Sequence, residues 1–226
     1  MSKSREQLFD GEDTLRRDSQ VSLDSAGVQL GRKPGALWRA CKAAGRMLAL
    51  AAITVCGVSL ANTIRPSGIV IHHSALSSED LAQIPGPADA SDIDSLHEKR
   101  GFRTFYWGRM FHIGYHYLIL SDGTVQNGRP EHCVGSHAPG HNDSLGICLI
   151  GNFSSRANPK GEMGNEEPTE AQIRSLVLLI KNLSGEYRIS CDQIYRHNDL
   201  NPRTLCPGDR LPWAKILTQI GCSTKK

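Results

Sequence analysis

Two histidines, one cysteine and one tyrosine have the residue types and the sequence settings for hydrolytic metal chemistry. His72 follows a short apolar run, Tyr115 lies in a Gly-Tyr-His-Tyr string, and His197 and Cys206 flank a loop that contains Pro202. A hydrolytic zinc site usually has three protein ligands and an open fourth position, whereas a structural site is closed by four. Two imidazoles and one thiolate fit the open pattern, and the tyrosine can work beside it.

The sequence around these residues resembles the zinc-dependent N-acetylmuramoyl-L-alanine amidases, the family of phage lysozyme-type amidases and animal peptidoglycan recognition proteins. The resemblance runs from about residue 67 to residue 213 and includes strings in the family's order at residues 96–102, 121–125, 135–142 and 144–151. It implies a zinc cofactor held by His72, His197 and Cys206. It also implies hydrolysis of the amide bond between N-acetylmuramic acid and L-alanine in peptidoglycan or muropeptides.

The same resemblance suggests which other residues act in the site. Tyr115 takes the position of the family's catalytic tyrosine, and Thr204 stands where many relatives have lysine or threonine. His137 and Asn142, with His141 near them, match a loop that lines the substrate groove in the family. The alternative for these three residues is a solvated loop without contact to substrate.

The chain departs from part of the family at two positions. Relatives that recycle muropeptides carry a glutamate where this chain has Cys148 and a lysine where it has Thr204. No charged catalytic group is therefore expected at either position, and the general base stays unassigned. Two other functions remain open: a peptidoglycan-binding module without catalysis, in which a zinc ligand is usually lost, and a structural zinc protein, which needs a fourth ligand such as His116 or His137.

Apolar periodicity predicts the elements that position these residues. Residues 68–73, 113–120 and 145–150 are expected to form strands, and a turn at residues 121–124 starts a hairpin. Helices are expected at residues 93–100 and 213–220, and a longer helix, capped by Thr169 and Gln172, extends to Tyr187. Residues 77–94 are expected to form a flexible loop. The alternation of strands and helices predicts an α/β domain over residues 66–220, with a mixed, mainly parallel sheet flanked by helices.

Strand geometry also predicts which side chains share a face of the sheet. Successive side chains of a strand point to opposite faces, so only one of His72 and His73 can reach a given metal. By the same alternation, we expect Tyr115 and Tyr117 on one face and His116 on the other.

Composition limits the classes of partner. The chain has 226 residues, 39% of them hydrophobic, and a formal net charge of +3, which does not indicate a nucleic-acid partner because such surfaces show clustered basic residues or a known module. We expect a monomer that binds peptidoglycan or a muropeptide. Residues 67–226 contain an odd number of cysteines, consistent with one metal-bound cysteine, and Cys191 with Cys222 is a possible disulfide.

The N-terminal sequence predicts export. Residues 1–31 are polar and are expected to be a disordered tail, and residues 32–61 combine a basic region with an apolar run. This order is typical of a signal peptide, with cleavage after Ala61, or of a membrane anchor through residues 47–61. Both predict a location in the periplasm or at the cell surface. The long tail indicates either a start codon assigned too far upstream or a cytoplasmic segment.

Overall fold

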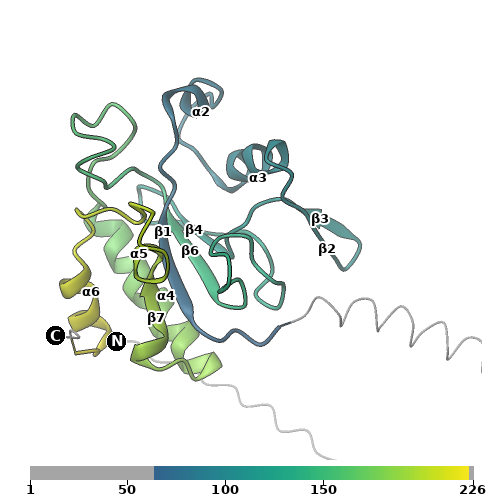
Figure 1. Cartoon of the computed structure of the whole chain (residues 1–226), viewed down its shortest axis with the longest axis vertical. Helices are drawn as coiled ribbons and strands as arrows, with labels where there is room; N and C mark the ends of the chain where they lie inside the picture. Colours follow the sequence, from purple (N-terminus) through teal and green to yellow (C-terminus); the bar gives the residue numbers. More distant parts are fainter. Residues whose placement is uncertain (1–63, 224–226) are drawn as a thin grey trace, which may run out of the picture. The chain divides into compact units, whose positions relative to one another are not determined.

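A five-stranded sheet forms the centre of the chain in the computed structural model, which describes residues 64–223 (Figure 1). The tail and the signal or anchor segment predicted over residues 1–61 lie outside the described residues. The strands, in the order β5-β4-β6-β1-β7 across the sheet, are β5 (Val125–Asn127), β4 (Tyr117–Ile119), β6 (Leu145–Leu149), β1 (Ile69–His73) and β7 (Ile194–Arg196). Only β5 runs antiparallel to its neighbour. The predicted mixed, mainly parallel sheet is confirmed.

The two central strands are buried on both faces. Every residue of β1 and β6 is buried, and both strands are short and mainly apolar, as expected for parallel strands covered by helices. His72 lies opposite Cys148 in the register of this pair. The ligand candidate His72 is therefore held by the most enclosed part of the sheet.

Two helices cover one face of the sheet. The helix α4 (Glu170–Tyr187) and the helix α6 (Trp213–Ile220) pack against the apolar side chains of β1 and β6 that point to this face. The helix α4 begins with the predicted capping box, in which Thr169 accepts from the backbone N–H of Gln172. Both helices lie where the periodicity placed them.

The other face is covered by α2 (Ser78–Ala82) and α3 (Ala90–Lys99), with α3 packed over Leu118 and Cys148. The prediction of a flexible loop over residues 77–94 is wrong. Two capping boxes, one of Ser77 with Asp80 and one of Asp89 with Asp92, lie in this segment. They start helices although the apolar residues here show little helical periodicity. The helix α3 accordingly begins at Ala90, before the predicted residue 93.

The predicted strand over residues 113–120 is shortened to β4, and this changes the face on which Tyr115 lies. Tyr117 packs with the core under α4 and α6, whereas Tyr115 packs with the core under α3. The expectation that the two tyrosines share a face is wrong, because β4 begins only at Tyr117 and alternation holds only within a strand.

Three smaller features complete the fold. A hairpin of β2 (Thr104–Tyr106) and β3 (Arg109–Phe111), not predicted from the sequence, forms a separate two-stranded sheet. A 3₁₀ turn at Cys191–Gln193 precedes β7, and the short helix α5 (His197–Leu200) follows it. The suggested disulfide between Cys191 and Cys222 is present. Within residues 64–223, no helix is long and apolar enough to span a membrane.

Candidate metal centre

Two neighbouring parallel strands bring the predicted histidine ligands together. The register aligns Ile71 of β1 with Arg196 of β7, so the next residues, His72 and His197, lie side by side at the carboxyl ends of their strands. Their ring centroids are 4.6 Å apart. Ligands typically bind at this edge of an open α/β sheet.

Cys206 returns to this edge through the loop that follows α5. Its Sγ lies 3.5 Å from Nδ1 of His72 and accepts the backbone N–H of His73 at 3.4 Å. One ligand atom from each of His72, His197 and Cys206 lies within 4.8 Å of the others. Among residues 64–223, this is the only group of histidine, cysteine or acidic side chains with such spacing.

A chain of hydrogen bonds fixes which nitrogen of His72 can bind a metal. Nε2 of His137 lies 2.9 Å from the carbonyl oxygen of Ser144 and must donate to it, since a carbonyl can only accept. Nδ1 of the neutral His137 ring therefore accepts from Nε2 of His72, at 3.1 Å. The remaining nitrogen, Nδ1 of His72, carries a free lone pair and faces Cys206.

Gly146 makes the space for this chain. A Cβ atom at this position of β6 would lie 2.6 Å from Cδ2 of the His137 ring, well inside van der Waals contact. The glycine lets the His137 ring lie against the strand, where it is 7% exposed, and reach His72.

The electrostatics of the site suit neutral, electron-donating ligands. Burial, and then the neighbouring rings of His137 and His197, lower the pKa of His72 well below its usual value. Burial also lowers the pKa of His197, whose Nε2 is buried without a hydrogen-bond partner. Burial raises the pKa of the Cys206 thiol to about 12, so a bound cation is needed to hold the thiolate. An unpartnered imidazole nitrogen beside a thiol fits a metal ion with affinity for nitrogen and sulfur.

No further histidine closes the site with a fourth bond. In the neighbouring rings, Nδ1 accepts a hydrogen bond from a backbone N–H or from His72, and these rings are His73, His97, His116 and His137. Burial is the main cause that lowers the pKa of all four rings, so they are neutral and have no spare lone pair. The structural zinc alternative, which needed His116 or His137 as a ligand, therefore finds no support in the geometry.

Tyr115 lies against His72, with 5.2 Å between their ring centroids, and against His97, at 5.4 Å. Burial, followed by the thiols of Cys148 and Cys206, raises the pKa of Tyr115 well above its usual value. The phenol is therefore protonated at neutral pH and can donate a hydrogen bond beside the candidate metal site.

Thr204 acts on the loop that carries Cys206. Its Oγ1 accepts the backbone N–H of Cys206 at 3.1 Å, which orients Cys206. The nearby Asp199 pairs with the Arg196 side chain at 2.7 Å and accepts the Arg196 backbone N–H. It caps α5.

The three residues that were expected to line a substrate groove have different environments in the structure. His137 is buried, with both ring nitrogens bonded inside the protein. Asn142 shapes the loop, because its Oδ1 accepts the backbone N–H groups of His137 and Ala138 at 2.9 Å and 2.8 Å. His141 alone has an exposed side chain. Contact of the three residues with substrate stays a prediction.

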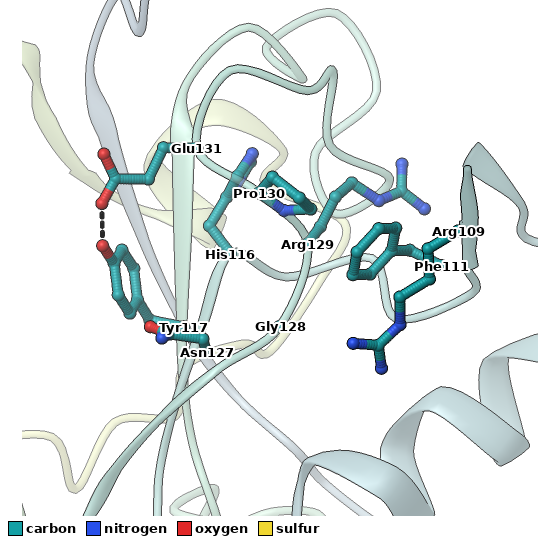
Figure 2. A pocket seen from close by; sticks show the side chains of 9 residues that line it. All are labelled: Arg109, Phe111, His116, Tyr117, Asn127, Gly128, Arg129, Pro130 and Glu131. Atoms are coloured by element: carbon teal, nitrogen blue, oxygen red, sulfur yellow. Dashed lines mark hydrogen bonds between the residues drawn. The ribbon is translucent and has the colours of Figure 1, made fainter. Parts of the chain in front are cut away.

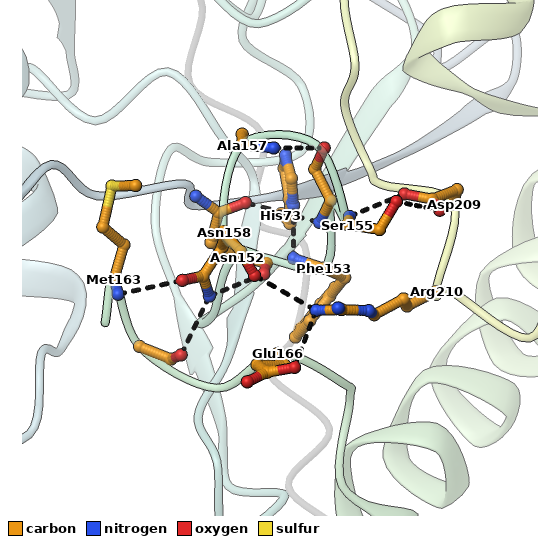
Figure 3. A network of polar contacts seen from close by, with 12 residues as sticks. His73, Asn152, Phe153, Ser155, Ala157, Asn158, Met163, Glu166, Asp209 and Arg210 are labelled. Atoms are coloured by element: carbon orange, nitrogen blue, oxygen red, sulfur yellow. Dashed lines mark hydrogen bonds and ion pairs between the residues drawn. The ribbon is translucent and has the colours of Figure 1, made fainter. Parts of the chain in front are cut away.

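A polar network that the sequence did not reveal supports the loop that carries Cys206 (Figure 3). Nδ1 of His73 accepts the backbone N–H of Phe153, whose carbonyl oxygen accepts the backbone N–H of Arg210. The Arg210 side chain also binds the carbonyl oxygen of Asn158 and the carboxylate of Glu166, at 3.2 Å and 2.9 Å. These contacts fasten the chain just after Cys206 to the segment beside β1. They join residues far apart in sequence, so no local motif signals them.

We expect the substitution His137→Phe to weaken metal binding by about 10- to 100-fold, because it removes the acceptor that orients His72. Zinc affinity, measured by competition with a chromogenic chelator, checks this. His141→Phe, in the exposed part of the same loop, serves as the control and should leave the affinity unchanged. A folded His137→Phe protein with wild-type zinc affinity would show that the hydrogen bond has no part in binding.

Comparison with known proteins identifies the family. The N-acetylmuramoyl-L-alanine amidase family profile matches residues 62–209. The endolysins of Klebsiella phage KP32 and Enterobacteria phage T3 are 36% and 41% identical over 96 residues, which cover 42% of this chain and 58% of each endolysin. The chain thus matches little more than half the length of these relatives.

A solved structure agrees. The endolysin N-acetylmuramoyl-L-alanine amidase LysCS from Clostridium intestinale superposes with a TM-score of 0.55 and 34% identity, covering 71% of this chain and 86% of LysCS. The profile spans more than half of the chain and includes the His72, His197 and Cys206 cluster. The chain belongs to the N-acetylmuramoyl-L-alanine amidase family.

Proposed function

We propose that the protein is a zinc-dependent amidase that hydrolyses the bond between N-acetylmuramic acid and L-alanine in peptidoglycan or muropeptides. The observation that carries the proposal is the cluster of His72, His197 and Cys206, with an unpartnered Nε2 on His197 and no fourth ligand in the described part of the chain. Family membership supplies the substrate class. The presence of the cysteine ligand argues against a recognition module that has lost its metal.

Zinc bound by these residues would lower the pKa of a water molecule and polarise the scissile carbonyl. His72 and His197 would hold the ion as neutral imidazoles, and the hydrogen bond from His72 to His137 keeps Nδ1 of His72 unprotonated. Tyr115, protonated and adjacent to His72, donates to the oxygen that gains negative charge when the carbonyl becomes tetrahedral.

Thr204 has a positioning part in this proposal. Its oxygen orients the Cys206 backbone, and its hydroxyl hydrogen is left to bind substrate. Cys148, at the position of the glutamate in recycling relatives, is buried with its pKa raised well above the usual value, chiefly by burial. It is an uncharged thiol and takes no proton during the reaction.

We further propose that the enzyme acts outside the cytoplasm, in the periplasm or at the cell surface, as a monomer. The basic and apolar segment at residues 32–61 supports export, and the disulfide between Cys191 and Cys222 supports it independently, because such bonds persist in oxidising compartments. Tethering through residues 47–61 would keep the enzyme at the membrane.

Product analysis tests the activity. The full chain, loaded with zinc, is incubated with a soluble muropeptide, and mass spectrometry follows the products. We expect the free disaccharide, with its lactyl carboxylate, and a peptide that begins with a free L-alanine amino group. Cleavage within the sugar chain or within the peptide, or no cleavage by zinc-loaded protein, would contradict the proposal.

A further inference from the structure

A groove separate from the metal centre runs between the β2–β3 hairpin and the outer edge of the sheet (Figure 2). It consists of two adjoining cavities of about 420 Å³ and 490 Å³. Both cavities are lined by Arg109, Phe111, Asn127 and Gly128, so they adjoin along these residues, and we call the two together the groove. It lies along β5, the strand at the opposite side of the sheet from β7.

The walls of the groove combine an aromatic ring with polar groups that have no partner. The guanidinium of Arg109 lies 4.9 Å from the centre of the Phe111 ring, which fixes its place without neutralising it. Within residues 64–223, the side chains of Arg109 and Asn127 make no hydrogen bond or ion pair. At the far end, the phenols of Tyr117 and Tyr187 donate to the Glu131 carboxylate. The groove therefore offers hydrogen-bond donors beside an aromatic face.

The outer face of the same hairpin is apolar and exposed. Phe105 and Met110 are cross-strand partners, and their side chains are 59% and 45% exposed. Trp107 at the tip is 82% exposed. The tip residues Trp107 and Gly108 both have positive φ, 47° and 77°, as in the tight turns that match strand twist. An exposed apolar group of this kind marks an interaction surface.

The base of the hairpin is fixed to α3, which also packs against Tyr115. Asp94 of α3 accepts the backbone N–H groups of His112 and Ile113 at 2.8 Å and 2.7 Å, just after β3. On the other side of the hairpin, the His97 ring packs against both Phe102 and Tyr115. A molecule held by the hairpin is thereby held at a set position relative to Tyr115.

The hairpin segment is basic, whereas the groove beside it has mixed charge, with Asp89, Asp94 and Glu131 in its lining as well as Arg109 and Arg129. No acidic residue lies between Glu98 and Asp122 in the sequence, whereas four basic residues do, namely Lys99, Arg100, Arg103 and Arg109. A glycan strand with acidic stem peptides would meet this surface favourably. Anionic lipid shares the charge, but the unpartnered amide and guanidinium in the groove suit the hydroxyl and N-acetyl groups of sugars.

The geometry points to a second binding site, in which the β2–β3 hairpin and its groove hold the glycan strand of polymeric peptidoglycan. This inference rests on the proposed function and specifies its substrate as the polymer. The faces of the aromatic rings carry partial negative charge and attract the C–H groups of a sugar ring. Arg109 and Asn127 donate to sugar oxygens in the groove. The inference predicts that the polymer engages this site and the metal centre together, whereas a soluble muropeptide engages the metal centre alone.

The test uses the full chain and the variant Trp107→Asn. Asn-Gly is the preferred pair for this turn type, so the variant keeps the hairpin and loses only the ring. We expect kcat/KM on insoluble peptidoglycan to fall about tenfold, a change of ~1.4 kcal/mol, with kcat/KM on a soluble muropeptide unchanged. Leu178→Asn, which replaces a side chain that is 62% exposed on α4, is the control and should alter neither value.

A binding assay decides the matter independently of catalysis. Full-length wild-type protein should sediment with peptide-free glycan strands, and Trp107→Asn should do so about tenfold more weakly, even if no amide is cleaved. Equal binding of the two proteins to these strands would overturn the inference. A second outcome would also overturn the inference. If Trp107→Asn cleaves the polymer normally but no longer binds vesicles of phosphatidylglycerol and phosphatidylcholine, the hairpin binds lipid.

Discussion

The Cys206→Ser protein should contain almost no zinc and should cleave muropeptide at least about 10³-fold more slowly than wild type. A serine hydroxyl stays protonated where the cysteine can become a thiolate, so the site loses its only anionic ligand. The remaining donors, His72 and His197, are both neutral. Zinc content by elemental analysis and the rate of release of peptide amino groups measure the two effects.

Cys133→Ser provides the matched control for this substitution. Cys133 is also a buried free cysteine, but its thiol is not part of the metal cluster. We expect this variant to keep its zinc and its activity. Stoichiometric zinc and a normal rate in Cys206→Ser would show that the thiol is not a ligand.

Tyr115→Phe should lower kcat by roughly 10²- to 10³-fold, the usual effect of removing one donor to a developing oxyanion. Zinc content should not change, because Tyr115 contacts the ring of His72 without joining the ligand set. KM should change little, since the phenol donates mainly in the transition state. Steady-state kinetics on a soluble muropeptide, together with zinc analysis, measures the three values.

Tyr117→Phe is the corresponding control. Tyr117 is two residues away in sequence but belongs to the core on the other face of the sheet, where its phenol donates to Glu131. Its loss should reduce stability by about 1 kcal/mol and leave kcat unchanged. A Tyr115→Phe protein with wild-type kcat would remove the phenol from the proposed chemistry.

The sequence predicted the site best where a residue's place follows from a strand or from a family string. His72 and His197 come together because each stands at the carboxyl end of one of two paired parallel strands, and the strand before His72 is an apolar run that the sequence shows plainly. The helix α4 was equally clear, since its buried residues recur at helical spacing and Thr169 caps it. These features depend on contacts within one helix or between two paired strands, and such contacts leave a pattern in the local sequence.

The features that were missed depend on contacts that the local sequence does not encode. The burial of His137 requires Gly146 on a neighbouring strand and the carbonyl oxygen of Ser144, so its string alone suggested an exposed groove residue. Tyr115 changed face because β4 starts only at Tyr117. The β2–β3 hairpin was overlooked because its apolar residues are exposed and therefore lack the alternation of a half-buried strand.

We propose that zinc held by His72, His197 and Cys206 gives the protein its amidase activity. The most direct measurement is a titration of the full chain with a chelator, in which bound zinc and the release of L-alanine amino termini are recorded on the same samples. We predict one zinc per chain, a parallel loss of zinc and activity, and recovery of both when zinc is restored. Full amidase activity in zinc-free protein, or a zinc-loaded protein that binds peptidoglycan without cleaving it, would contradict the claim.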